Sequence, residues 1–196
     1  MWSLPRSLSF LGATALALPS PVQALDDESP AAVAKATMAA QNARDDMLET
    51  FGSDHLNDGQ FLWQDGTREV TRVVVSLGDQ LVYAYDNDQL VGVATTSTAR
   101  EGYITPPGIF SVLAKSRTYR SKKFDNAPMP YAQRIDNYGI AMHGGEPLPG
   151  YPASHGCIRL PTKFAARLFA MTDIGTEVYI GGSPPSLDPS QVAEKD

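Results

Sequence analysis

Short apolar runs separated by turn residues occupy most of the chain, a pattern typical of a mainly β protein. Residues 69–77, 81–85 and 90–93 are rich in β-branched and aromatic side chains, and the last two runs flank an Asp-Asn-Asp break. This composition, with a period of two, favours strands, and the break favours a hairpin between two of them. Residues 109–113 and 178–180 predict two further strands.

The second half of the chain is less regular. Residues 139–143 are short and apolar enough for a buried strand that carries His143 at its end. The Gly- and Pro-rich residues 144–152 predict a loop. Residues 118–137 follow no clear period and predict a long surface excursion, a kind of segment that often forms a lid.

One helix is predicted after the loop, followed by the last strand. Thr162 is a suitable N-cap residue, and Gly175 suits the end of the helix. The apolar face of this helix would consist of Phe164, Leu168 and Met171.

The first 24 residues have the pattern of a secretory signal peptide. Arg6 is the only charged residue before an apolar run from Leu8 to Leu18, and the segment ends in small residues up to Ala24. A membrane helix needs about 20 apolar residues, more than this run offers. We therefore expect export to the periplasm or cell envelope, with no stable membrane span.

Export with cleavage predicts a mature chain that begins at Leu25. N-terminal sequencing of protein recovered from the cell envelope checks this expectation. An intact Met1 on that protein would contradict cleavage and would favour an uncleaved membrane anchor.

The rest of the chain divides into three expected parts. Residues 25–68 are expected to form an N-terminal arm with one amphipathic surface helix, whose weak apolar positions are Ala34, Met38, Ala39 and Leu48. Residues 69–181 are expected to form a single folded domain. Residues 182–196, rich in Pro and Ser, are expected to be a flexible tail.

Charge and cysteine content exclude several classes of protein. The chain has 22 acidic and 16 basic residues and a net charge of −6, so nucleic acid has no general electrostatic reason to bind. A single cysteine cannot form an internal disulfide or supply a zinc site with several thiolates. We expect no cofactor and no metal.

The solitary Cys157 lies in a cluster of reactive side chains. His143 and His155 bracket the loop that leads to it, in the run Ser154-His155-Gly156-Cys157-Ile158-Arg159. A thiol with a pKa of about 8.5 needs a base to act at neutral pH, and an imidazole with a pKa of about 6.5 can serve. The alternative is an inert, buried thiol that acts as a small hydrophobic group.

The spacing assigns the base. His155 lies only two residues from Cys157 and would need a special turn to reach the sulfur, whereas the loop can bring His143 across to it. Gly156 permits a tight backbone conformation, so that the N–H groups of Gly156 and Cys157 can point at an oxyanion. Arg159 would either steady the thiolate or bind a substrate carboxylate, unless it is an ordinary surface charge.

These motifs resemble the active-site signature of bacterial L,D-transpeptidases of the YkuD type. The resemblance rests on His143-Gly144 and on the run from Ser154 to Arg159. It extends through residues 75–77, a Tyr-rich strand, and residues 97–108 and 129–131. It implies a mainly β fold of two mixed sheets with a short helix after the motif. It makes residues 69–181 the catalytic domain.

The resemblance also implies a reaction and its residues. In this family, a cysteine attacks a peptidoglycan stem peptide, releases D-Ala and passes the acyl group to an amine. The implied roles are Cys157 as nucleophile, His143 as base, the Gly144 carbonyl as its orienting group, Ser154, His155 and Gly156 in the pocket and oxyanion hole, and Arg159 and Tyr131 in substrate binding.

Other functions remain open at this point. An L,D-carboxypeptidase, or an enzyme that forms or cleaves links between an envelope protein and peptidoglycan, would use the same nucleophile with a different acceptor. A non-catalytic wall-binding domain would keep only the pocket. A zinc hydrolase would use His143, His155 and Cys157 as ligands, although no Glu stands at the spacing of a metalloprotease helix.

Overall fold

The computed structural model describes residues 26–67, 69–183 and 185. The expected signal peptide and most of the expected tail lie outside the described residues. The elements are β1 (Asp26–Asp27), α1 (Pro30–Phe51), β2 (Phe61–Trp63), β3 (Arg72–Ser76), β4 (Leu81–Asp86), β5 (Gln89–Thr95), β6 (Gly108–Ser111), β7 (Ala114–Arg120), β8 (Pro128–Arg134), β9 (Ala141–Gly144), β10 (Ile158–Leu160), α2 (Thr162–Met171) and β11 (Glu177–Gly181).

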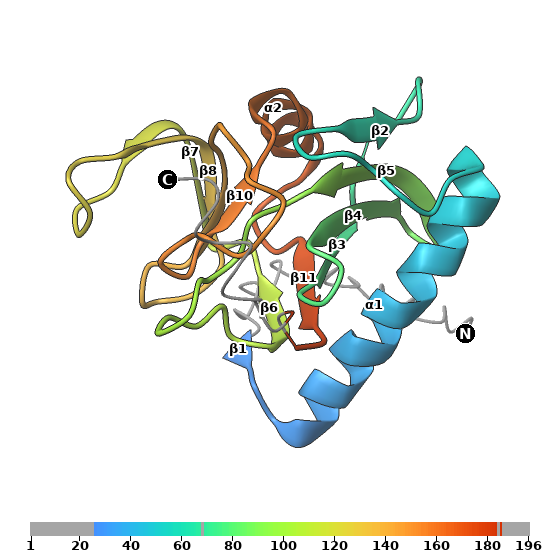
Figure 1. The fold of residues 1–196 in the computed structure, drawn as a ribbon, viewed down its shortest axis with the longest axis horizontal. Coiled ribbons are helices and arrows are strands. Elements are labelled where there is room, and N and C mark those ends of the chain that lie inside the picture. The colour runs from blue at the N-terminus through green and yellow to red at the C-terminus, as the bar shows by residue number, and fades with distance from the viewer. Residues whose placement is uncertain (1–25, 68, 184, 186–196) are drawn as a thin grey trace, which may run out of the picture.

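Two mixed sheets form the molecule, which confirms the predicted mainly β fold class (Figure 1). The larger sheet has seven strands in the order β1-β6-β11-β3-β4-β5-β2, and the smaller has four in the order β10-β9-β8-β7. Each sheet contains one parallel pair, β11 with β3 and β10 with β9. The predicted hairpin joins β4 to β5, with Asp86 paired to Gln89.

Both faces of the large sheet are buried. On β3, Val73 and Val75 face the main core, which the small sheet and α2 complete, whereas Val74 faces the opposite side under α1. A strand covered on both faces reads as a continuous apolar run rather than as an alternation of apolar and polar residues. This explains the run of three valines at residues 73–75.

The predicted arm is part of this fold. Its helix α1 begins after the N-cap Ser29, whose hydroxyl accepts a hydrogen bond from the Ala32 N–H, and ends at Gly52, which has a φ of 69°. The helix lies along one face of the large sheet, and β2 from the same segment pairs with β5 (Figure 1). The segment from β1 to β2 therefore belongs to the packed structure rather than to an arm beside it.

The buried face of α1 differs from the expected one. Met38 and Leu48, two of the predicted apolar positions, are largely exposed. The buried positions are Ala32, Ala36, Ala40, Ala43 and Met47. Small side chains on this face let the helix approach the sheet closely: a Cβ on Gly181 of β11 would lie 2.2 Å from the carbonyl oxygen of Ala36. The hydrophobicity of the individual residues alone therefore predicted the wrong buried face of α1.

Truncating the one large side chain on this face should destabilise the protein. Met47 is 0% exposed, so Met47→Ala should lower the free energy of unfolding by about 2–5 kcal/mol. Met38 lies on the same helix and is 62% exposed, so Met38→Ala should change it by less than about 0.5 kcal/mol. Urea unfolding of both variants measures the difference, and equal values would show that α1 is not packed in solution.

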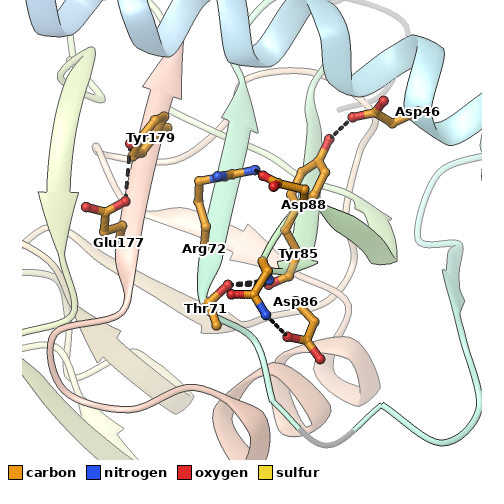
Figure 2. A network of polar contacts seen from close by, with 9 residues as sticks. Asp46, Thr71, Arg72, Tyr85, Asp86, Asp88, Glu177 and Tyr179 are labelled. Carbon is orange, nitrogen blue, oxygen red and sulfur yellow. Dashed lines mark hydrogen bonds and ion pairs between the residues drawn. The ribbon is translucent and has the colours of Figure 1, made fainter.

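A ladder of side chains on the large sheet borders α1 (Figure 2). The Arg72 guanidinium lies 4.9 Å from the centre of the Tyr85 ring and 5.9 Å from that of Tyr179, on the two neighbouring strands. The Tyr85 hydroxyl donates a hydrogen bond of 2.7 Å to Asp46 of α1. The hydrogen bond to Asp46 attaches the helix to the sheet, and the stacked guanidinium joins three neighbouring strands.

The predicted excursion at residues 118–137 is largely a β-hairpin. Its strands β7 and β8 pair with Thr118 opposite Pro130, and the hairpin extends away from the body of the molecule (Figure 1). The outer part of β7 is exposed, so it lacks the apolar alternation that marks a strand. Pro128 and Pro130 are tolerated because β8 pairs with β9 only at Gln133 and Arg134.

The helix α2 follows the small sheet. Its N-cap is Pro161, with no capping hydrogen bond from a side chain, so the predicted cap at Thr162 is wrong, and the helix ends at Met171. At the other end, the Lys115 ammonium donates a hydrogen bond of 2.7 Å to the Phe169 carbonyl and another to the Thr172 carbonyl. A cation on the last carbonyls of a helix is stabilising.

Among the described residues, no helix combines the length and the apolar character that a membrane crossing requires.

Candidate active site

The parallel pair β9 and β10 places the predicted nucleophile and base on one face of the small sheet. Arg159 pairs with His143, and paired residues point to the same side. Cys157 stands two residues before Arg159, so its side chain lies on that face too. The residues between them, Met142 and Ile158, point the other way into the main core. Strand pairing thus joins two segments that the sequence separates by the Gly- and Pro-rich loop.

This face forms the floor of a cavity of about 580 Å³. The β7–β8 hairpin contributes its roof, including Tyr119, Phe124 and Met129. Both His143 and Cys157 line the cavity, as do Gly144, Ser154, His155 and Arg159. Six predicted site residues therefore come together around one space.

The imidazole of His143 is held in one tautomer. Its Nδ1 donates a hydrogen bond of 2.8 Å to the carbonyl of Gly144, which leaves Nε2 without a proton. Burial lowers the pKa of His143, and the nearby positive charge of Arg159 lowers it further, against the opposing effect of the Gly144 hydrogen bond. His143 is therefore a neutral base at neutral pH.

The thiol of Cys157 is also neutral in this state. Burial raises its pKa, with a smaller contribution from the negative charge of Asp136, although a backbone hydrogen bond from Ala141 opposes the rise. The sulfur donates to the carbonyl oxygen of Gly139 at 3.7 Å and packs against Met129 and Ala141. Such a thiol requires a base to become a nucleophile.

Ser154 shapes the turn that carries Cys157. Its hydroxyl donates to the carbonyl oxygen of Cys157 at 2.6 Å and accepts from the Gly156 N–H at 3.1 Å. Gly156 has a φ of 123°, and a Cβ there would lie 2.7 Å from Cδ1 of Ile140, so only glycine fits.

This turn corrects the predicted oxyanion hole. The Gly156 N–H already bonds to the Ser154 hydroxyl, so it is not free to bind an oxyanion. The Cys157 N–H has no hydrogen-bond acceptor within the part of the chain that the structure describes. Only the second of the two predicted donors is therefore available.

Arg159 enters the cavity without a carboxylate partner. Its guanidinium donates to the Ser97 hydroxyl at 3.2 Å, and its buried Nε has no hydrogen-bond partner. Within residues 26–67, 69–183 and 185, no acidic side chain forms an ion pair with it. Burial lowers the pKa of Arg159, which remains charged at any physiological pH. The cavity therefore offers an unpaired cation to an anionic group.

His155 lies exposed at the mouth of the cavity, in what we call the aromatic clasp, formed by Tyr103, Phe124 and His155. Its ring stacks on that of Phe124 at the hairpin tip, with 4.4 Å between the ring centres. It forms a T-shaped contact with Tyr103, with 4.6 Å between the ring centres. Its Nε2 lies 2.8 Å from the guanidinium of Arg100 and accepts that hydrogen bond. Partial burial lowers the pKa of His155, and the charge of Arg100 adds to this effect. The ring thus connects the catalytic loop to the roof.

Tyr131 does not line this cavity, contrary to the prediction of a substrate contact. Its ring packs edge-on against Phe169 of α2, with 5.9 Å between the ring centres, and it borders the main core. Its φ of 57° marks an irregular place in β8, and the β7–β8 pairing gives no partner for Tyr131. The neighbouring Met129 and Pro130 face the cavity instead.

Sequence reasoning missed several residues around the site. Ser97, Arg100 and Tyr103 come from a segment more than fifty residues before His155, and Phe124 comes from the hairpin tip. The first three lie within residues 97–108, which belong to the family resemblance, but their residue types predicted no role for them. The exposed aromatic residues of the excursion were the one signal that could have suggested a contact.

The described residues offer no set of ligands for the alternative of a zinc hydrolase. Among the residues described, no three His, Cys, Asp or Glu side chains converge as metal ligands. His155 directs its Nε2 to Arg100 rather than toward Cys157.

Known proteins resemble this chain in sequence and in fold. The family model of the YkuD L,D-transpeptidase catalytic domain matches residues 70–180. Among solved structures, an L,D-transpeptidase from Stackebrandtia nassauensis is similar, with a TM-score of 0.56 and 26% identity over 64% of this chain and 61% of that chain. One from Mycobacterium tuberculosis has a TM-score of 0.52 and 26% identity over 55% of this chain and 56% of that chain.

A third similar structure is a cysteine-to-serine mutant of the Enterococcus faecium L,D-transpeptidase. It has a TM-score of 0.51 and 26% identity over 57% of this chain and 50% of that chain. The chain thus spans less than two thirds of each of these solved proteins. No curated protein sequence matches it significantly. Since the family model covers more than half of the sequence, the chain belongs to the YkuD L,D-transpeptidase catalytic domain family.

Proposed function

We propose that the protein is a cysteine-dependent L,D-transpeptidase that acts on peptidoglycan stem peptides in the periplasm or cell envelope. The observation that carries the proposal is the placement of His143 on β9 and of Cys157 directly before the parallel strand β10, both on the lining of one cavity, with the Nδ1 of His143 bound to the Gly144 carbonyl. This arrangement supports a nucleophile, a base and an orienting group in fixed roles. Membership of the family supports the same reaction class.

The reaction begins with a proton transfer. Nε2 of His143 takes the thiol proton as Sγ of Cys157 attacks the carbonyl carbon before the terminal D-Ala. The neutral resting states of both groups support general-base catalysis rather than a preformed ion pair. Because the thiol is hydrogen-bonded to the Gly139 carbonyl, the Cys157 side chain has to rotate toward His143 when substrate binds.

The tetrahedral intermediate then collapses to a thioester. The Cys157 N–H binds the oxyanion, and the imidazolium, stabilised by the Gly144 carbonyl, gives its proton to the leaving amine of D-Ala. An amine of a second stem attacks the thioester, gives its proton to His143, and the thiol is regenerated. Arg159 binds a carboxylate of the donor, since the protein offers it none.

The acceptor distinguishes this function from its alternatives. Water would make the protein an L,D-carboxypeptidase, and a protein amine would make it a ligase. Mass spectrometry of the products from mature protein and a disaccharide-tetrapeptide tests the choice. We expect a cross-linked dimer and free D-Ala. A tripeptide as the only product would contradict transpeptidation, and an unchanged substrate would favour a wall-binding domain without catalysis.

His155 should affect binding more than chemistry. His155→Ala removes the stacking on Phe124, and an aromatic pair of this kind contributes about 0.5–1.5 kcal/mol. We expect a higher KM, a smaller fall in kcat and a lower midpoint of thermal unfolding. Phe124→Ala should have the same signature because it breaks the same contact. A large fall in kcat alone for His155→Ala would contradict a role in holding the roof.

A further inference from the structure

The roof of the catalytic cavity carries positive charge. Lys122 and Lys123, at the tip of the β7–β8 hairpin, line the same space as Arg159. Lys123 also donates a hydrogen bond of 3.0 Å to the carbonyl of Tyr138, and the neighbouring Phe124 stacks on His155. Two contacts therefore hold the tip and its lysines over the floor that carries Cys157.

Among the residues that line the cavity, basic side chains outnumber acidic ones. Glu146 is the only Asp or Glu among the residues that line it, against Lys122, Lys123 and Arg159. Its carboxylate accepts a hydrogen bond of 3.2 Å from the Thr162 N–H at the start of α2. Across the described residues, no acidic side chain forms an ion pair with any of the three cations. This cavity is thus locally cationic in a protein whose net charge is −6.

We propose that Lys122 and Lys123, together with Arg159, select donor peptides whose side-chain carboxylates are free and discriminate against donors in which these groups are carboxamides. The inference rests on the proposed function, since it names the class of donor for the same site. A carboxylate placed among three cations gains charge-assisted contacts that a neutral amide lacks.

The size of the preference follows from the exposure of the lysines. Exposed ion pairs contribute modestly, so each lysine should account for a factor of about two to five in kcat/KM. Since salt screens exposed charges, the preference should also shrink at high ionic strength. A steric preference for the smaller or differently shaped group would not depend on salt.

Two synthetic donors test the proposal. One is L-alanyl-γ-D-glutamyl-meso-diaminopimelyl-D-alanine, and the other has the free glutamyl and diaminopimelyl side carboxylates converted to carboxamides. Release of D-Ala gives kcat/KM for each with the mature wild type and with Lys122→Gln/Lys123→Gln. Glutamine keeps a donor for the Tyr138 carbonyl, so the roof contact is preserved. Stoichiometric alkylation of Cys157 by iodoacetamide, a neutral probe, counts the active protein.

Lys35→Gln is the matched control, because it removes one positive charge from α1 and lies outside the catalytic cavity. We expect the wild type and this control to prefer the free carboxylates by roughly tenfold or more at low salt, and the double variant to lose most of the preference. Equal kcat/KM for both donors, or a preference that the double variant keeps, would overturn the inference alone. If neither donor reacts while Cys157 is alkylated, the proposed function is overturned, and the inference with it.

Discussion

Cys157→Ala should abolish release of D-Ala while leaving the fold intact. No other thiol exists in the sequence, so no neighbouring group can take over the attack. The side chain packs against Met129, Ala132 and Ala141, and its replacement by the slightly smaller alanine should cost about 1 kcal/mol of folding free energy. Assays of D-Ala release together with urea unfolding separate loss of chemistry from loss of structure.

Cys157→Ser serves as the matched control for this variant. A hydroxyl is a far weaker nucleophile than a thiol beside the same base, so its activity should be nearly as low. Full activity of Cys157→Ala would overturn the assignment of the nucleophile, and loss of the folded state in both variants would point to a structural role for this position.

His143→Ala should slow acylation of Cys157 by roughly 10²–10⁴, the usual contribution of general-base catalysis. The dependence on pH should change as well. In the wild type, the rate falls only when pH drops below the lowered pKa of His143, because a protonated imidazole cannot accept the thiol proton. Without the imidazole, the rate should instead increase with pH toward the raised pKa of the thiol, since only the thiolate then reacts.

Acylation of the thiol by a carbapenem, measured between pH 5 and pH 10, checks this prediction, and His155→Ala is the comparison. Both imidazoles have lowered pKa values, so the position of an ionisation does not identify the base. Its loss does. If the imidazole ionisation persists in His143→Ala and disappears in His155→Ala, the two histidines have the opposite roles.

The strands with buried side chains were predictable from the sequence. The runs at residues 73–75 and 81–85 are apolar because α1 and the main core cover both faces of the sheet. The β7–β8 hairpin could not be predicted in the same way, since its outer residues are exposed and two prolines interrupt it. The prediction of the buried face of α1 was wrong. Close packing against β11 requires alanine, whose hydrophobicity is too weak to mark a buried position.

The local chemistry of the candidate site followed from residue types, whereas its surroundings did not. His143, Cys157 and Arg159 stand out because thiol, imidazole and guanidinium groups cluster in a short stretch. The aromatic clasp and the Ser97 contact join segments that are far apart in sequence, and only the fold brings them together. The available oxyanion donor depends on a single hydrogen bond from Gly156 to Ser154, which no residue pattern specifies.

The covalent intermediate tests the central proposal most directly. Mature wild-type protein is mixed with a disaccharide-tetrapeptide whose side-chain amine is acetylated, so that no acceptor amine is present, then quenched in acid and measured by intact-protein mass spectrometry. We expect a mass gain equal to the donor minus D-Ala, located on the peptide that contains Cys157 and absent from Cys157→Ala. Turnover without this adduct, or the same adduct on another residue or on Cys157→Ala, would contradict it.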